Sequence, residues 1–221
     1  MDFFNLPSRT KVGRVVPKNA FDEYTNTKQK KQFTDGIQRI TWTHKLSSET
    51  VNLEAKDIKE IQVFKVELKE QTDILKILEI INKAIPYHIV FWVEFKEQAY
   101  ISTAVKHPHP TNEDISVLDW TFTSDWFNVT AKPFQFNLKG SLDTVFKDLC
   151  IQLTGKPDFY EKPIDSIVDN LQRIDKLKKE VLRLKLSISK SGQFKEKVQL
   201  NLNSFQYFVE QHLRIKEFSH Y

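Results

Sequence analysis

Two long amphipathic segments at the end of the chain, separated by only a few residues, most constrain how it can fold. Over residues 163–189 apolar residues recur at helical steps, which predicts one long helix. Residues 189–192 break the pattern, and residues 194–218 then predict a second helix with one apolar stripe: Val198, Leu202, Phe205, Val209 and Leu213. Because so short a turn forces long helices to lie antiparallel, residues 161–221 are predicted to form a helical hairpin (coiled-coil-like).

The preceding residues, 1–160, mix strand and helix patterns and predict an α+β domain built on a mixed sheet. Residues 60–69 alternate, with Phe64, Val66 and Leu68 on one face, as in a strand. Residues 72–85 predict a helix packed across the sheet, and residues 87–95 are apolar on both faces, as in a central strand. Residues 99–105 follow as a hairpin partner, residues 117–127 as a further strand, and Ser141 caps a short helix.

Three other segments carry weaker patterns. The first 25 residues predict an extended basic arm, anchored by Phe3, Phe4 and Leu6 and closed by a short helix. Apolar residues at helical spacing predict a helix over residues 28–46. Residues 107–112, His-Pro-His-Pro-Thr-Asn, predict a rigid polar loop, because proline fixes the backbone and removes a donor.

Composition and charge exclude several classes of function. A single cysteine, Cys150, excludes a disulfide framework and a multi-cysteine zinc site, and no phosphate-binding or nucleophile motif is present. No apolar run approaches the roughly 18 residues of a membrane span, and the start of the chain does not resemble a signal peptide. The expectation is therefore a cytoplasmic protein with no membrane partner and no cofactor. The net charge of +4 comes from the hairpin region, since residues 1–160 are neutral.

One group of residues has the order of a magnesium-dependent nuclease of the PD-(D/E)xK kind. Such an enzyme needs two carboxylates to hold Mg²⁺ and a lysine beside the attacking water. Asp57 precedes Glu67 by ten residues, and Glu67 and Lys69 lie two apart on one strand face. The alternative interpretation is that Glu67 and Lys69 are the solvated face of an amphipathic strand.

Other candidate residues suggest binding rather than catalysis. A basic cluster on and after the arm would neutralise phosphates of a nucleic acid: Arg9, Lys11, Arg14, Lys18, Lys28, Lys30 and Lys31. His107 and His109 are interpreted as exposed loop residues rather than metal ligands, so no metal site is predicted. Four residues widen the apolar arc of the hairpin beyond one seam and predict a partner-binding surface, for a second copy or a heterologous subunit: Leu177, Leu184, Phe208 and Phe218.

Nearly the whole chain resembles a family of bacterial proteins of unknown function. The resemblance lies in residues 6–7 and 16–18, 61–64 with 68–69, 84–91, and 193–194 with 197–201. Members of that family are often encoded beside DNA methyltransferases and DEAD/DEAH-type helicases in restriction and phage-defence islands. The resemblance implies an accessory subunit of a DNA modification or defence assembly. Together with the hairpin and the basic cluster, it favours an interaction subunit that docks on a helicase or methyltransferase, with contact to DNA as a further possibility. It supplies no established active site.

Overall fold

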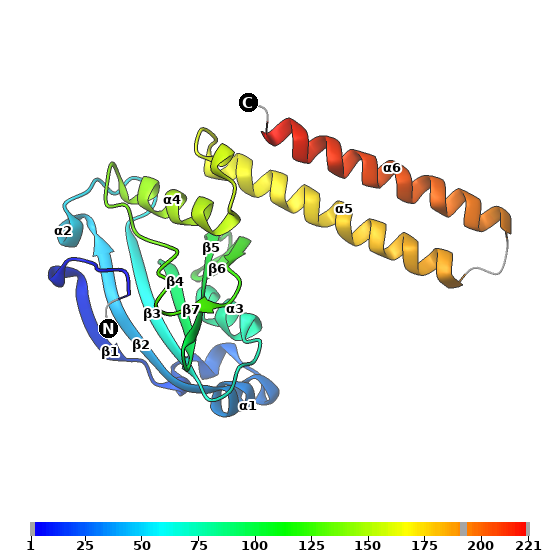
Figure 1. Ribbon diagram of the computed structural model, residues 1–221. Helices are drawn as coiled ribbons and strands as arrows, with labels where there is room; N and C mark the ends of the chain where they lie inside the picture. Colours follow the sequence, from blue (N-terminus) through cyan, green and yellow to red (C-terminus); the bar gives the residue numbers. More distant parts are fainter. Residues whose placement is uncertain (1–2, 191–193, 220–221) are drawn as a thin grey trace. The chain divides into compact units, whose positions relative to one another are not determined.

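The protein was analysed as a computed structural model that describes residues 3–190 and 194–219. The chain forms two compact units, Met1–Gly155 and Lys156–Tyr221 (Figure 1). The first unit is α+β with a mixed sheet and the second is a pair of helices, as the sequence predicted. The boundary lies at residue 155 rather than 160.

The sheet of the first unit follows the order of the chain. Its strands pair in the order β1-β2-β3-β4-β5-β6, and β7 pairs with β5. Among the pairings of these strands in the described residues, β3–β4 is parallel and the others are antiparallel. The strands are β1 (Lys11–Val15), β2 (Ile37–Ser47), β3 (Glu60–Leu68), β4 (His88–Phe95), β5 (Gln98–His109), β6 (Asn112–Thr123) and β7 (Phe127–Asn128).

Three helical segments build the main core on one face of the sheet. The helix α3 (Leu75–Ala84) connects the parallel strands β3 and β4, because parallel neighbours need a crossover. The helix α1 (Thr27–Gly36) and the 3₁₀ helix η2 (Lys18–Tyr24) complete this layer. Ile81 on α3 and Phe91 on β4 are fully buried in this core. The predicted helix across the sheet and the predicted central strand are therefore confirmed.

The opposite face is covered by α4 (Leu142–Thr154) and by the start of the chain (Figure 1). The Ser141 side chain accepts a hydrogen bond from the Thr144 N–H, at 3.2 Å, and caps α4 as predicted. Phe4 and Leu6 are buried, so the predicted anchoring of the arm is confirmed. Cys150 is also buried, and burial raises the pKa of its thiol, which makes it a packing residue. Two short helices, η1 (Ser8–Thr10) and α2 (Ser48–Val51), flank β2.

The helix predicted over residues 28–46 is wrong in its second half. The helix ends at Gly36, and the chain continues as strand β2 from Ile37. Phe33, Ile37 and Ile40 do share helical spacing, but Ile40 and the Thr-Trp-Thr that follows have strong β propensity. Pairing with β3 along Ile37–Ser47 then satisfies the backbone of the whole segment.

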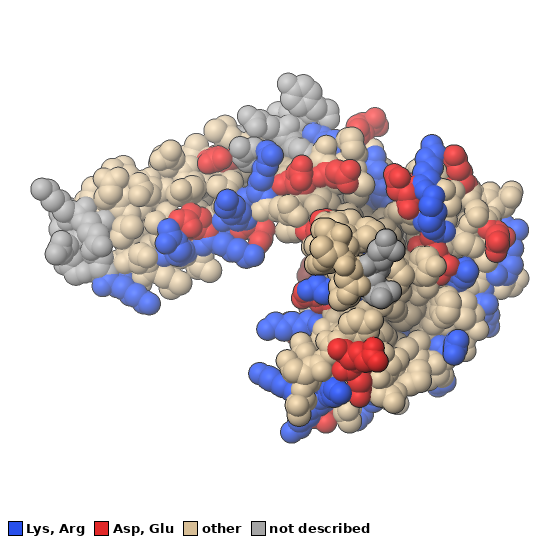
Figure 2. All heavy atoms as spheres, turned by 180° about the vertical axis from the view of Figure 1, so that it is seen from behind, with Lys and Arg blue, Asp and Glu red and all other residues tan. Residues whose placement is uncertain are grey.

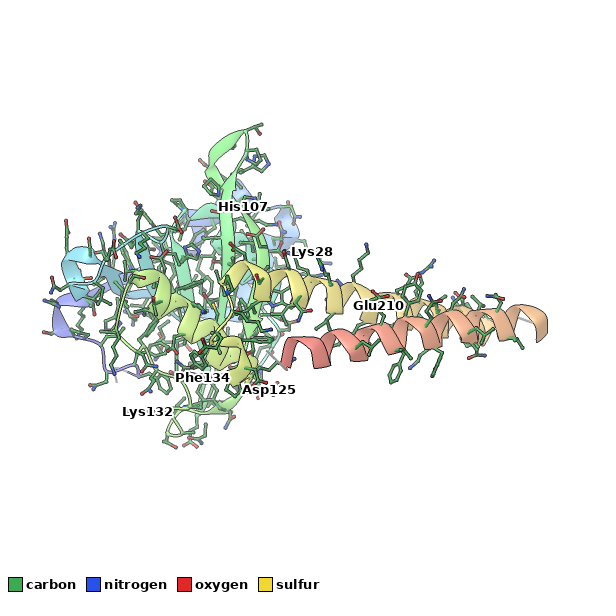
Figure 3. All side chains as sticks on the ribbon, turned by 90° about the horizontal axis from the view of Figure 1, so that it is seen from above. Lys28, His107, Asp125, Lys132, Phe134 and Glu210 are labelled. Atoms are coloured by element: carbon green, nitrogen blue, oxygen red, sulfur yellow. The ribbon has the colours of Figure 1, made fainter. Side chains whose placement is uncertain are left out.

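The rigid loop predicted at residues 107–112 is also wrong. Strand β5 continues through His109, β6 begins at Asn112, and the two form a hairpin with a tight turn (Figure 3). Pro108 and Pro110 are compatible with this hairpin because proline is tolerated near the ends and at irregular positions of strands. The register shifts between Pro108 and His109, which is such an irregularity.

The second unit consists of η3 (Pro157–Phe159), α5 (Ile164–Lys190) and α6 (Phe194–Ser219). The helices α5 and α6 pack side by side, which confirms the predicted hairpin (Figure 1). Among the described residues, none of the helices combines the length and apolar character that a membrane span requires.

Candidate functional site

The structure does not assemble the predicted nuclease triad. Glu67 lies near the end of β3, whereas Asp57 precedes the start of that strand at Glu60. Because a strand rises about 3.3 Å per residue, Glu60 and Glu67 are roughly 23 Å apart. The Lys69 side chain donates to the carbonyl of Thr34, at 2.8 Å. A nuclease site needs Asp57 close to Glu67, and here Asp57 lies before the start of β3 while Glu67 lies near its end.

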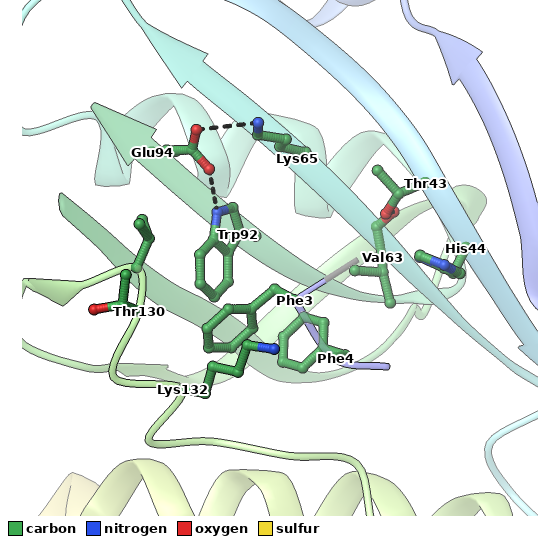
Figure 4. Close-up of a pocket in the computed structure, with 11 residues that line it drawn as sticks. Phe3, Phe4, Thr43, His44, Val63, Lys65, Trp92, Glu94, Thr130 and Lys132 are labelled. Atoms are coloured by element: carbon green, nitrogen blue, oxygen red, sulfur yellow. Dashed lines mark hydrogen bonds and ion pairs between the residues drawn. The ribbon is translucent and has the colours of Figure 1, made fainter. Parts of the chain in front are cut away.

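Glu67 instead belongs to an ion-pair network that sequence reasoning missed. The parallel register of β3 and β4 places Glu67 beside Glu94. Lys65 lies between them, with its ammonium 3.4 Å from Glu67 and 3.1 Å from Glu94. The indole N–H of Trp92 donates to the second oxygen of Glu94, at 2.9 Å (Figure 4). The available signal was Lys65 and Glu67, two apart near the end of β3, together with Glu94 in the otherwise apolar strand β4.

This network borders a cavity of about 480 Å³ on the α4 side of the sheet (Figure 4). One wall is aromatic, since Phe3 and Phe4 lie against Trp92 with ring centroids 3.6 and 5.9 Å away. Lys132 lies at one side and Thr43 and His44 at another. Among the described residues, no three His, Cys, Asp or Glu side chains lie close enough together to hold a metal ion. The cavity therefore offers aromatic packing and one ion pair.

The predicted basic cluster is spread over several elements. Arg9 lies on η1, and Lys11 and Arg14 lie exposed on the edge strand β1. The ammonium of Lys18 donates to the carbonyl of Ile37, and Lys30 pairs with Asp22 at 3.2 Å.

Lys28 and Lys31 lie on α1, beside a groove that also contains three acidic residues, Asp35, Glu70 and Asp73. On the face drawn in Figure 2, basic and acidic side chains are interspersed. The seven basic residues thus come from four elements and two of them have partners within the chain, and contact with nucleic acid stays a prediction.

The two histidines lie on the β5–β6 hairpin, and each has its own hydrogen-bond partner. His107 Nδ1 is 2.9 Å from the carboxylate of Asp119 across the hairpin, and His109 Nδ1 is 3.2 Å from the hydroxyl of Thr111. Each imidazole thus has a hydrogen-bond partner within the hairpin.

A buried lysine is the most perturbed charged group that sequence reasoning missed. Lys106 is 7% exposed, and its amine donates to the carbonyls of Asn82 and Ile85, at 2.6 and 2.5 Å. These carbonyls end α3, so Lys106 closes the end of that helix. Burial lowers the pKa of Lys106 to about 7. Burial, and then the charge of Lys106, lowers the pKa of His88 to about 4.

The hairpin has one buried seam. On α5 the seam consists of large aliphatic side chains that are 6–9% exposed: Ile174, Leu177, Val181 and Leu184. On α6 the side chains turned toward α5 are Leu200, Ser204, Tyr207 and Gln211, which are buried or half-buried. Leu177 and Leu184 were predicted to bind a partner, and this is wrong, because both lie in the seam. Phe208 is 45% exposed. The side chain of Phe218 lies outside the described residues.

The apolar stripe predicted for α6 does not face α5. Its five residues, 38–67% exposed, are Val198, Leu202, Phe205, Val209 and Leu213. Leu202 lies two residues before the buried Ser204, which is about 200° around a helix. The stripe, called the outer stripe below, is therefore on the opposite side of α6 from the seam. The small Ser204 side chain leaves room for the bulky aliphatic row of α5.

Comparison with known protein families identifies the family of the chain. The family described as Domain of unknown function (DUF4391) matches residues 4–206. The chain belongs to this family. No curated protein and no solved structure matches it. For this DUF4391 protein the family description leaves the function open, so the proposal below depends on the surfaces of the structure.

Proposed function

We propose that this protein is a non-catalytic interaction subunit of a bacterial restriction-modification or phage-defence complex. In this proposal the hairpin docks on a larger helicase or DNA methyltransferase subunit. The resemblance to proteins encoded beside such enzymes supports the identity of the partner. The observation that carries the proposal is the apolar surface that the α5–α6 pair leaves exposed on both of its helices.

Exposed apolar side chains of this size favour association. Leu182 and Leu186 on α5 are 60% and 54% exposed, and the outer stripe on α6 adds five more apolar residues. Burial of apolar surface contributes about 25 cal/mol per Å², so a contiguous patch gains free energy when a partner covers it.

The surroundings of Leu182 and Leu186 favour an acidic partner surface. Residues 171–190 contain seven Lys or Arg and two acidic residues. Both acidic residues pair within α5, Asp175 with Lys179 at 2.6 Å and Glu180 with Arg183 at 2.5 Å. Lys178, Lys185 and Lys190 each lie within four residues of one of the exposed leucines and flank them. We assign this face of α5 to the larger subunit, because complementary charge guides such docking.

The nuclease alternative receives no support from the arrangement of Asp57, Glu67 and Lys69. Contact with DNA remains part of the proposal, and the exposed residues Arg9, Lys11 and Arg14 are its candidates.

Capture of the larger subunit tests the proposed function. The tagged protein is produced together with the helicase or methyltransferase encoded beside it, and both are recovered on the tag. We expect the wild type to retain the larger subunit and Leu182→Asp/Leu186→Asp to lose it. Leu75→Asp, at a 39% exposed position on α3, is the control and should retain it. Absence of capture by the wild type, or equal capture by all three proteins, would contradict the proposal.

A further inference from the structure

The outer stripe of α6 has an internal symmetry. Its residues Val198, Leu202, Phe205, Val209 and Leu213 are separated by steps of four, three, four and four. The stripe is therefore nearly the same when it is followed in either direction from Phe205. An antiparallel copy centred there would place Val198 opposite Leu213, Leu202 opposite Val209, and Phe205 opposite itself.

The surroundings of the stripe are those of a protein–protein seam. Residues 198–209 contain no charged side chain. Depletion of charged residues is typical of the centre of an interface, whereas an exposed helix face usually carries charges. The stretch from Val198 to Leu213 is about 22 Å long at 1.5 Å per residue. This stretch contrasts with α5, whose outer surface is basic.

We propose that the outer stripe binds the outer stripe of a second copy of this chain, with the two α6 helices antiparallel. The proposal rests on the proposed function in treating the hairpin as the docking element. It assigns the outer face of α6 to a second copy of the chain. The resulting four-helix arrangement leaves Leu182 and Leu186 of each copy for the larger subunit.

Packing and symmetry favour the antiparallel direction. Each valine then meets a leucine, so side-chain volume is even along the seam, whereas a parallel pair would place valine on valine and leucine on leucine. Phe205 meets its own copy on the two-fold axis, where the rings form an aromatic pair. A two-fold interface also closes on itself, which limits the assembly to a dimer.

Sedimentation equilibrium of two matched variants tests whether the stripe self-associates. Leu202 on α6 and Leu182 on α5 are each 60% exposed, so aspartate at either position leaves the core of the hairpin intact. We expect a dimer for the wild type at micromolar concentration, a dimer for Leu182→Asp, and at least a tenfold weaker association for Leu202→Asp. A monomeric wild type, or equal effects of the two substitutions, would overturn the proposal.

Cross-linking of introduced cysteines tests the direction of the helices. The natural Cys150 is buried, so introduced thiols are the ones that form an intermolecular disulfide on mild oxidation. Phe205→Cys should cross-link to itself. Val198→Cys should cross-link little to itself but efficiently to Leu213→Cys when the two proteins are mixed. Efficient self-linking of Val198→Cys would show a parallel pair and overturn the proposal.

The two experiments separate this inference from the proposed function. If the chain is a dimer that captures no larger subunit, the proposed function fails and the α6 pairing stands. If the larger subunit is captured but the chain alone is monomeric, the α6 pairing fails and the proposed function stands.

Discussion

The two units of this protein treat their apolar surface in opposite ways. In the sheet unit, helices cover both faces, and central residues such as Ile81, Val90 and Phe91 are completely buried. In the hairpin unit, one seam is buried while Leu202 and Phe205 are 60% and 67% exposed. An apolar stripe in the sequence therefore does not by itself show that the stripe is buried within the chain. A unit that leaves a stripe in water is built to meet another surface.

Truncation of matched leucines should give the largest difference between buried and exposed positions. Leu78 on α3 is 2% exposed, and Leu78→Ala should lower the free energy of unfolding of the sheet unit by about 2–5 kcal/mol. Leu75→Ala, at a 39% exposed position on the same helix, should change it by less than about 0.5 kcal/mol. All four tryptophans lie within residues 1–155, so tryptophan fluorescence in denaturant follows this unit alone. If the two substitutions lower the free energy of unfolding equally, the difference between buried and exposed leucines is contradicted.

The seam of the hairpin should behave as a small core. Leu184→Ala removes a side chain that is 6% exposed and should destabilise the helical hairpin by about 2 kcal/mol. Leu182→Ala, on the outer surface of the same helix, should have little effect. Thermal unfolding followed by circular dichroism at a helical wavelength provides the comparison. If Leu182→Ala is the more damaging change, α5 packs with a different face than described.

Lys106 should make the stability of the sheet unit depend on pH. Its pKa is about 7 in the folded protein, because burial disfavours the charged form, and near 10.5 in the unfolded chain. Above pH 7 the unfolded chain therefore binds a proton that the folded protein lacks, so raising the pH favours folding. Relative to Lys106→Met, the free energy of unfolding of the wild type should rise by up to about 1.4 kcal/mol per pH unit between pH 7 and 9. A pH-independent difference would show that Lys106 keeps its charge.

Asp143 should contribute a smaller, acid-sensitive part of the stability. Its carboxylate accepts hydrogen bonds from the backbone N–H groups of Lys56, Asp57 and Ile58, at 3.0–3.1 Å. Burial raises the pKa of Asp143, but these bonds outweigh burial and lower it overall from its ordinary value of 3.8.

Asp143→Asn should therefore cost about 1 kcal/mol at pH 7. The difference from the wild type should disappear as the pH falls through the lowered pKa, because the wild-type carboxylate is then protonated. Denaturant unfolding of both proteins at pH 7 and near pH 3 measures this. If Asp143→Asn lowers the free energy of unfolding equally at both pH values, the effect comes from altered packing and not from loss of the carboxylate charge.

Strong local patterns predicted most of the fold. Residues 75–84 have a continuous apolar stripe and a stop at Pro86, and 142–154 have a serine cap and a glycine end, so local signals agree. Residues 37–46 were misassigned because helical spacing and β propensity compete there, and only pairing with β3 decides between them. The His-Pro hairpin likewise depends on pairing between β5 and β6.

The candidate site depends on contacts that sequence spacing does not contain. Glu67 and Glu94 become neighbours only through the parallel register of β3 and β4. Lys106 reaches the end of α3 from a strand more than twenty residues away. For α6, helical spacing selected the one apolar stripe as the packing face, but in the structure that stripe is exposed and the small Ser204 lies on the buried side.

Thiol labelling at three positions tests the central claim, that the hairpin and not the sheet unit is the docking part. Single cysteines at positions 205, 182 and 75 are labelled in the chain alone and with the larger subunit present. We predict slow labelling at 205 in both states, fast labelling at 182 that slows only with the larger subunit, and fast labelling at 75 in both states. Protection at 75, with 182 and 205 reactive throughout, would contradict the account.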